Sequence, residues 1–154
     1  LLVGGIAGIW MGGSLADRFG AAKRRMYAII PAVAFLATIP FYVGAVTSDS
    51  LVVSFVLFLV PTALGLVWLG PVLSSIQHVV PPQMRATASA VFLFVNNLIG
   101  IGLGTVALGA LSDALSAQFG ADSLRYAILA GTVFYLVAAS LFLLSAKRLE
   151  KDWV

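Results

Sequence analysis

The chain has 154 residues, of which 61% are hydrophobic and 10% are charged, and its formal net charge is +3. Soluble domains carry about 25% charged residues, so this composition excludes an ordinary water-exposed surface and indicates a protein solvated by a lipid bilayer. The positive charge does not indicate nucleic acid binding, because the basic residues form short clusters between apolar runs. No cysteine is present, which excludes disulfides and thiolate metal sites.

The chain opens inside an apolar run, with neither an initiator Met nor a basic region before Leu1. A signal peptide has a basic flank and a small-residue cleavage site. We therefore expect a piece of a longer polypeptide that enters partway through a helix.

Long apolar runs alternate with short polar segments along the whole chain. A membrane-spanning helix needs about 20 apolar residues. We expect a partial span over residues 1–13 and full spans over residues 26–46, 51–76, 86–111 and 124–146. Residues 112–123 are expected to form a polar loop and residues 147–154 a charged tail. The predicted fold is an all-α polytopic membrane protein.

Basic residues are concentrated on one side of the predicted membrane. Arg125 falls alone on the other side. The first group is predicted to be cytoplasmic by the positive-inside rule, which places the carboxy terminus inside. We expect an integral protein of the bacterial inner membrane. The cytoplasmic residues are Arg18, Lys23, Arg24, Arg25, Arg85, Lys147, Arg148 and Lys151.

The loop GSLADRFGAAKRR covers residues 13–25. It resembles the signature loop of the major facilitator superfamily, in which Gly, three residues, Asp, a basic residue and Gly precede further basic residues. Ala21 and Ala22 depart from this pattern, because they move the basic cluster along the chain. The resemblance implies a cytoplasmic latch that stabilises one access state. Its matching residues are Gly13, Asp17, Arg18, Gly20, Lys23 and Arg24.

Each residue of this loop has a physical rationale. Gly13 lets two helices approach closely, and Gly20 allows a tight turn. Asp17 can accept hydrogen bonds from free N–H groups at the start of a neighbouring helix. The alternative is an ordinary positive-inside loop with no further role.

Residues 70–113 resemble the tenth-to-eleventh helix region of the spinster family, a lipid-handling branch of the same superfamily. The resemblance rests on Ile76-Gln77, on VPPQMRA at 80–86, on NLIGIGLG at 97–104 and on GALSD at 109–113. Thr105 stands where proline is expected. The resemblance implies helices eight to twelve of the carboxy-terminal six-helix bundle of a two-bundle transporter. The missing amino-terminal bundle would be the partner, and an amphipathic lipid such as a lysophospholipid or sphingoid phosphate the substrate.

Two amides, Asn96 and Asn97, lie inside an apolar span. A polar group facing lipid without a partner is costly. At least one amide is therefore expected to face the protein interior or a water-filled path. An interhelical hydrogen bond and a contact in the substrate cavity or gate remain equally open.

The span over residues 51–76 is longer than the hydrocarbon is thick, so it must tilt or bend. Pro61 and Pro71 are expected to supply the bend of a gate. Trp68, Ser74, Ser75 and Gln77 are expected to line the mouth of the cavity.

Glycines recur at four-residue spacing in two places. Gly4, Gly8 and Gly12 lie in the partial span, and Gly100 and Gly104 lie in the fourth full span. Small residues at this spacing let membrane helices pack backbone to backbone, and packing is the favoured interpretation.

The sequence contains no pattern of residues typical of a catalytic or metal-binding site. His78 is the single histidine and cannot build a metal site without further ligands. No metal, no cofactor and no enzymatic activity are expected. No carboxylate lies mid-membrane, so if transport is coupled to protons, the coupling acids are expected in the absent half. Two alternatives stay open, namely a drug or organic-anion exporter and a non-transporting membrane scaffold.

Overall fold

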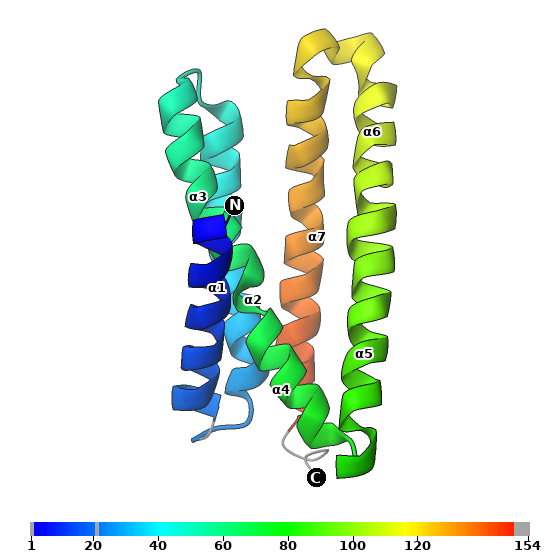
Figure 1. The fold of residues 1–154 in the computed structure, drawn as a ribbon. Helices are drawn as coiled ribbons and strands as arrows, with labels where there is room; N and C mark the ends of the chain where they lie inside the picture. The colour runs from blue at the N-terminus through cyan, green and yellow to red at the C-terminus, as the bar shows by residue number, and fades with distance from the viewer. Residues whose placement is uncertain (1, 21, 150–154) are drawn as a thin grey trace.

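The computed structural model describes residues 2–20 and 22–149, so the predictions made for Leu1, Ala21, Lys151 and the end of the tail lie outside the described residues. The described part is helical almost throughout and contains no strand. Figure 1 shows the arrangement. The helices are α1 (Leu2–Leu15), η1 (Ala16–Gly20), α2 (Met26–Thr47), α3 (Leu51–Val67), α4 (Leu69–Val79), η2 (Pro82–Met84), α5 (Arg85–Val95), η3 (Asn96–Leu103), α6 (Gly104–Phe119), η4 (Gly120–Asp122) and α7 (Ser123–Ala146).

Three helical segments among the described residues are long and apolar enough to cross a membrane, namely Met26–Thr47, Leu51–Val79 and Pro82–Ala146. The last of them reverses direction at η4, so α6 and α7 run antiparallel beside each other (Figure 1). Large apolar side chains such as Phe134 (76% exposed) and Trp10 (72% exposed) face outward. A bilayer supplies the apolar solvent that such a surface needs.

The predicted polar loop over residues 112–123 is wrong for most of its length. α6 continues to Phe119, and only Gly120–Asp122 forms the turn. Serine and alanine do not break a helix, and the Ser116 hydroxyl donates a hydrogen bond to the Asp113 carbonyl over 2.6 Å. The helix ends at Gly120, whose φ of 54° is open to glycine at low cost.

The connection between α4 and α5 follows from two prolines. α4 ends at Val79, and Pro82 opens a short 3₁₀ turn that leads directly into α5. A proline inside a helix removes a backbone donor and clashes with the preceding turn. The chain therefore breaks where Pro81 and Pro82 stand, as their position in the sequence predicts.

α7 packs along α2 and joins the two halves of the bundle (Figure 1). Alanines allow the close approach, since Ala32 and Ala127 are completely buried. Aromatic rings fill the remaining space. The Phe35 ring lies 5.4 Å from the Tyr135 ring and 5.8 Å from the Phe142 ring, measured between centroids. Such tilted and edge-to-face pairs are favourable.

α1 packs against α3 through its glycine face. Gly4, Gly8 and Gly12 are the buried residues of α1. A Cβ added to Gly8 would overlap the backbone carbonyl of Ala63, and one added to Gly12 would overlap that of Val67. The interface therefore brings backbone against backbone, as the spacing of these glycines predicts.

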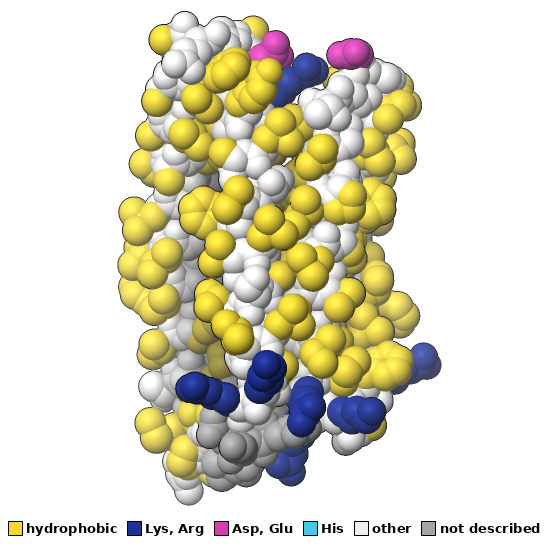
Figure 2. All heavy atoms as spheres, turned by 180° about the vertical axis from the view of Figure 1, so that it is seen from behind, with side chains coloured by type: hydrophobic (Ala, Val, Ile, Leu, Met, Phe, Trp, Pro, Cys, Tyr) yellow, Lys and Arg dark blue, Asp and Glu magenta, His cyan; other side chains and the backbone are white. Residues whose placement is uncertain are grey.

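The two ends of the bundle differ in charge, and Figure 2 shows a broad hydrophobic band between them. Lys and Arg side chains gather at one end, which we call the basic end (Figure 2). Asp122 and Arg125, at the start of α7, lie at the opposite end. The described residues of the basic end are Arg18, Lys23, Arg24, Arg25, Arg85, Lys147 and Arg148.

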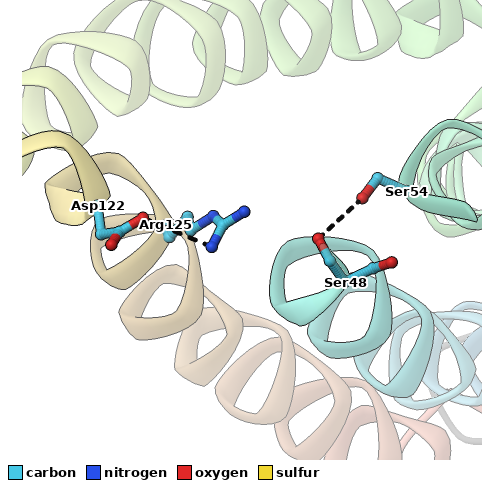
Figure 3. A network of polar contacts seen from close by, with 4 residues as sticks. All are labelled: Ser48, Ser54, Asp122 and Arg125. Carbon is cyan, nitrogen blue, oxygen red and sulfur yellow. Dashed lines mark hydrogen bonds and ion pairs between the residues drawn. The ribbon is translucent and has the colours of Figure 1, made fainter. Parts of the chain in front are cut away.

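At the opposite end, short polar contacts close the turns (Figure 3). The Ser54 hydroxyl donates to the Ser48 carbonyl over 3.4 Å, which ties the start of α3 to the end of α2. Arg125 and Asp122 form an ion pair of 3.5 Å at the start of α7. Both side chains are about half exposed, at 48% and 60%, so this pair contributes little stability.

Candidate functional site

The main candidate site is a cavity of about 610 Å³ among α2, α3, α6 and α7, nearer the end opposite the basic one. Its volume falls within the range of small-molecule sites, about 300–1,000 Å³. The lining is mostly hydrocarbon and aromatic ring. The lining residues are Tyr42, Phe55, Phe58, Leu59, Thr62, Leu108, Ile128, Gly131, Thr132 and Tyr135.

The polar atoms of this cavity are few. Thr62 donates its hydroxyl hydrogen to the Phe58 carbonyl over 2.7 Å, and Thr132 donates to the Leu129 carbonyl over 2.6 Å. Two tyrosines from different helices meet in the wall, with the Tyr42 and Tyr135 ring centroids 5.7 Å apart. The cavity therefore offers apolar contact with phenol groups as its main polar feature.

Sequence reasoning missed this cavity. The available signal was a pair of tyrosines inside apolar spans, since a tyrosine hydroxyl in a membrane usually finds a protein or water partner. The sequence alone does not show that Tyr42 and Tyr135 face each other.

A break in the long predicted span separates α3 from α4 at Trp68. Pro61 lies inside an uninterrupted α3, whereas Pro71 lies three residues after the break. Pro71 has no N–H, so the Val67 carbonyl loses its usual helical donor. Val67 is 2% exposed, and its carbonyl lies against Gly12 of α1, where a weak Cα–H contact is available.

None of the residues predicted at the mouth of the transport cavity lines the cavity described above. The Trp68 ring makes an edge-to-face contact with Phe92 of α5, with centroids 6.0 Å apart. Ser75 donates to the Pro71 carbonyl over 2.8 Å, and His78 Nδ1 donates to the Ser74 carbonyl over 2.8 Å. Gln77 is exposed. Their role in substrate entry stays a prediction.

Asn96 and Asn97 lie at the start of η3, a π-helical stretch. The Asn97 amide donates to the Leu93 carbonyl of its own helix over 2.8 Å, and both alternatives for the two amides stay predictions. Asn96 is half-buried and Asn97 is exposed. π-helical segments are rare in proteins, and those that occur are often found at functional sites. The sequence did not predict this one.

Gly100 and Gly104 lie in and after η3 with open space around them. A Cβ added to either would meet only atoms of its own helix, at 3.7 Å. No other described helix packs against this pair, in contrast to the glycines of α1.

The loop with the superfamily signature lies at the basic end. Asp17 and Arg18 belong to η1, and Arg18, Lys23 and Arg24 are exposed. Asp17 is also exposed and makes no hydrogen bond or ion pair within the described residues. The helix start predicted as its partner is therefore not among the described helices.

Helices α1 and α4 approach closely at Gly13, since a Cβ added to Gly70 would lie 3.0 Å from the Gly13 nitrogen. Gly13 tolerates a Cβ, because no atom lies within 4 Å of that position, whereas Gly12 carries the close packing. Gly20 is not in a left-handed turn, since Gly120 has the only positive φ among the described residues. A Cβ on Gly20 would instead lie 2.6 Å from the Tyr27 ring, so Gly20 makes room for that ring.

Tyr27 connects this loop to α4. Its ring centroid lies 6.4 Å from that of His78, near the end of α4. The loop, the start of α2 and the end of α4 therefore meet at the basic end.

Membrane-crossing helices, a broken helix and an apolar cavity define a polytopic integral membrane protein. The family model described as Major Facilitator Superfamily matches residues 1–105, and the chain belongs to this superfamily. Its described helices are part of the carboxy-terminal six-helix bundle of that fold.

Known proteins place the chain close to the spinster family within the superfamily. It is 33% identical to an "MFS-type efflux pump" of Mycolicibacterium smegmatis, covering 96% of this chain and 34% of that protein. It is 29% identical to "Protein spinster homolog 1" of Xenopus laevis, covering 96% of this chain and 30% of that protein. The chain thus spans about a third of these relatives.

Solved structures agree. A bacterial homologue of the human lysosomal transporter spinster, in an inward-facing and unoccupied conformation, superposes with a TM-score of 0.87 and 25% identity. The match covers 98% of this chain and 39% of that one. The inward-facing and occupied form gives a TM-score of 0.79 at 26% identity, covering 98% and 40%.

Proposed function

We propose that the complete protein is a secondary transporter that moves an amphipathic lipid, such as a lysophospholipid or sphingoid phosphate, by alternating access. The residues described supply part of the second bundle, and the absent first bundle completes the transport path. The shared length with the relatives supports this division, since the chain covers 39% of the spinster homologue structure.

The observation that carries the proposal is the apolar cavity. A wall of Phe55, Phe58, Leu59 and Ile128 suits an acyl chain, because burial of hydrocarbon drives its binding. In this proposal the cavity holds the tail, and the residues near the break, Trp68 to Gln77, line the path of the headgroup.

The proposed orientation places the basic end in the cytoplasm. There Asp17 acts in a latch whose acceptor or donor partner belongs to the absent bundle, which accounts for its exposure in the described part. The acids that couple transport to an ion also belong to that bundle.

Transport by the full-length protein in proteoliposomes tests the proposal, with a fluorescent lysophospholipid as the probe. Gly131→Leu fills the cavity, since the nearest neighbour of a Cβ there is Leu108 Cδ1 at 4.0 Å. We expect this variant to lose most lysolipid transport. Gly109→Leu on α6 is the matched control, because no atom lies within 4 Å of its Cβ. Equal rates in both variants would refute the role of the cavity.

Export of a hydrophobic drug is the second candidate, favoured by the similarity to the efflux pump of M. smegmatis. The same proteoliposomes decide between the two. Movement of a cationic dye without movement of the lysolipid would replace the lipid substrate by a drug.

A scaffold without transport activity is tested at Asp17. A scaffold tolerates Asp17→Ala, whereas a transporter with a latch loses turnover while its expression is unchanged. Asp49→Ala is the matched control, because Asp49 is also exposed but lies at the opposite end.

A further inference from the structure

A second cavity lies beside the cavity of the candidate site. Its volume is also about 610 Å³, which falls within the range of small-molecule sites. It lies between α1 and α3 and closer to the break at Trp68 than the first cavity, because the α3 residues that line it come later in that helix. The residues that line only this second cavity are apolar and include Gly5, Ile6, Ile9, Pro61, Gly65 and Leu66.

Three side chains line both cavities, and they come from three different helices. They are Tyr42 of α2, Thr62 of α3 and Tyr135 of α7. Each of them therefore has one side toward the first cavity and another side toward the second. Together they form a wall between the two cavities, and loss of a ring from this wall would join them.

The two rings of the wall are held by other aromatic rings. The Tyr42 ring meets the Phe58 ring edge to face, with centroids 5.8 Å apart, and the Tyr135 ring meets the Phe35 ring in the same way at 5.4 Å. The two tyrosine rings also contact each other, at 5.7 Å. Such pairs are favourable, so packing within the protein fixes the position of the wall.

Thr62 is fixed as well. Its hydroxyl donates to the Phe58 carbonyl over 2.7 Å, and a β-branched side chain has few rotamers in a helix. Its methyl carbon Cγ2 lies toward α1, because a Cβ added to Gly4 would be 3.0 Å from that carbon. The third member of the wall is therefore held between its own helix and α1.

A fixed wall limits what the first cavity can hold. Packed side chains in a protein yield little, so an apolar tail longer than the cavity must displace rings that are held by their neighbours. Overpacking of this kind weakens binding about tenfold. Behind the wall, the second cavity offers further apolar space of about the same volume.

We propose that Tyr42, Thr62 and Tyr135 set the longest acyl tail that the transporter accepts. The inference rests on the proposed lipid transport and deepens it, since it assigns selection among substrates to the length of the tail. The three side chains are specificity-determining residues, and the second cavity is the space that they withhold from the tail.

Competition for transport by the full-length protein in proteoliposomes tests the proposal. A fluorescent lysophospholipid is the transported probe, and unlabelled lysophosphatidylcholines with saturated tails from decanoyl to docosanoyl are the competitors. We expect competition by the parent protein to weaken about tenfold beyond a limiting tail length. The ratio of variant to parent at each length removes the differences in membrane partitioning among the competitors.

Loss of either ring moves this limit. Tyr42→Ala joins the two cavities, so tails just beyond the limit of the parent compete about tenfold better, because the overpacking is relieved. Tyr135→Ala has the same effect from α7. Tyr42→Phe keeps the ring and therefore keeps the limit of the parent.

A second substitution shows whether the gained space is the second cavity. Gly65 lines only that cavity, and no atom lies within 4 Å of a Cβ there. Gly65→Leu added to Tyr42→Ala therefore fills the space and restores the shorter limit. Gly109→Leu added to Tyr42→Ala is the matched control, because Gly109 lines neither cavity and its Cβ also has no neighbour within 4 Å.

The outcomes are distinct. If the parent does not transport the fluorescent lysophospholipid, the proposed function fails together with this inference. If the parent transports it and both alanine variants keep the limit of the parent, only the role of the wall is overturned. An equal loss at every tail length in both alanine variants would mean that the rings only support packing of the helices, and would also overturn it.

Discussion

Two glycine-rich regions of the bundle have similar sequence spacing and opposite surroundings. Gly8 and Gly12 of α1 lie against carbonyl groups of α3, and neither position has room for a methyl group. Gly100 and Gly104 also stand four residues apart, yet the only neighbours of an added Cβ are atoms of their own helix at 3.7 Å. Glycine spacing therefore predicts a helix face that can be approached closely, but does not show which helix approaches it.

The largest effect is expected at Gly12. Gly12→Ala drives a methyl group into the Val67 carbonyl, so α1 and α3 must separate, and overpacking of this kind costs about 1–3 kcal/mol. We expect a loss at the upper end, because the obstructing atoms are backbone. Unfolding of the full-length protein in detergent measures it.

Gly13→Ala is the matched control for that experiment. No atom lies within 4 Å of a Cβ at Gly13, and a substitution of this kind changes stability by about 0.5 kcal/mol or less. Equal losses of stability at both positions would contradict an interface in which α1 packs on α3 through Gly12.

Pro71→Ala tests the cause of the break at Trp68 between α3 and α4. The substitution restores an N–H for the Val67 carbonyl, so we expect α3 and α4 to approach one straight helix. Spin labels at Val53 and Gln77, both exposed, then move apart toward the span of a straight helix, about 36 Å. Pro61→Ala leaves the distance unchanged, because α3 is unbroken at Pro61. A distance that is the same with and without Pro71 would show that the break has another cause.

A smaller effect is expected at Gly20, where the obstacle is a side chain. Gly20→Ala places a methyl group 2.6 Å from the Tyr27 ring, and the ring can turn aside at a cost of about 1 kcal/mol. Tyr27→Ala in the same chain removes the obstacle. A double-mutant cycle therefore yields a coupling energy of about 0.5 kcal/mol or more, and additive losses would refute the contact.

The smallest effect is expected at Gly104. Gly104→Ala meets no described helix, and alanine has the higher helix propensity, so stability changes by about 1 kcal/mol at most. Thermal unfolding beside Gly12→Ala measures it. A loss as large as that of Gly12→Ala would mean that a helix outside the described residues packs on α6 as closely as α3 packs on α1.

The sequence predicted the fold more fully than the site, for physical reasons. Spans over apolar runs and a break at Pro81 and Pro82 follow from local rules, as does the glycine face of α1. The sequence analysis did not predict that α6 extends to Phe119, because it interpreted the serines and alanines of this segment as a loop. These residues are also compatible with a helix. The cavity was missed because Tyr42 and Tyr135 come from helices far apart in sequence.

The individual site residues show the same limit. Pro71 explains a break at Trp68, but the sequence did not place it there, because the freed carbonyl lies a turn before the proline. The sequence analysis explained Gly20 by the conformational freedom of its backbone. In the structure, Gly20 instead leaves space for the ring of Tyr27. Contacts between helices set these details, and spacing along one helix does not contain them.

The freed carbonyl of Val67 has a consequence for how this protein changes over evolutionary time. Pro71 exposes that carbonyl, and the bare backbone of Gly12 receives it. The two residues lie far apart in the gene but serve one contact. A Cβ at position 12 would overlap the Val67 backbone whichever residue stands at position 71. We therefore expect glycine at position 12 to persist even in lineages that lose Pro71.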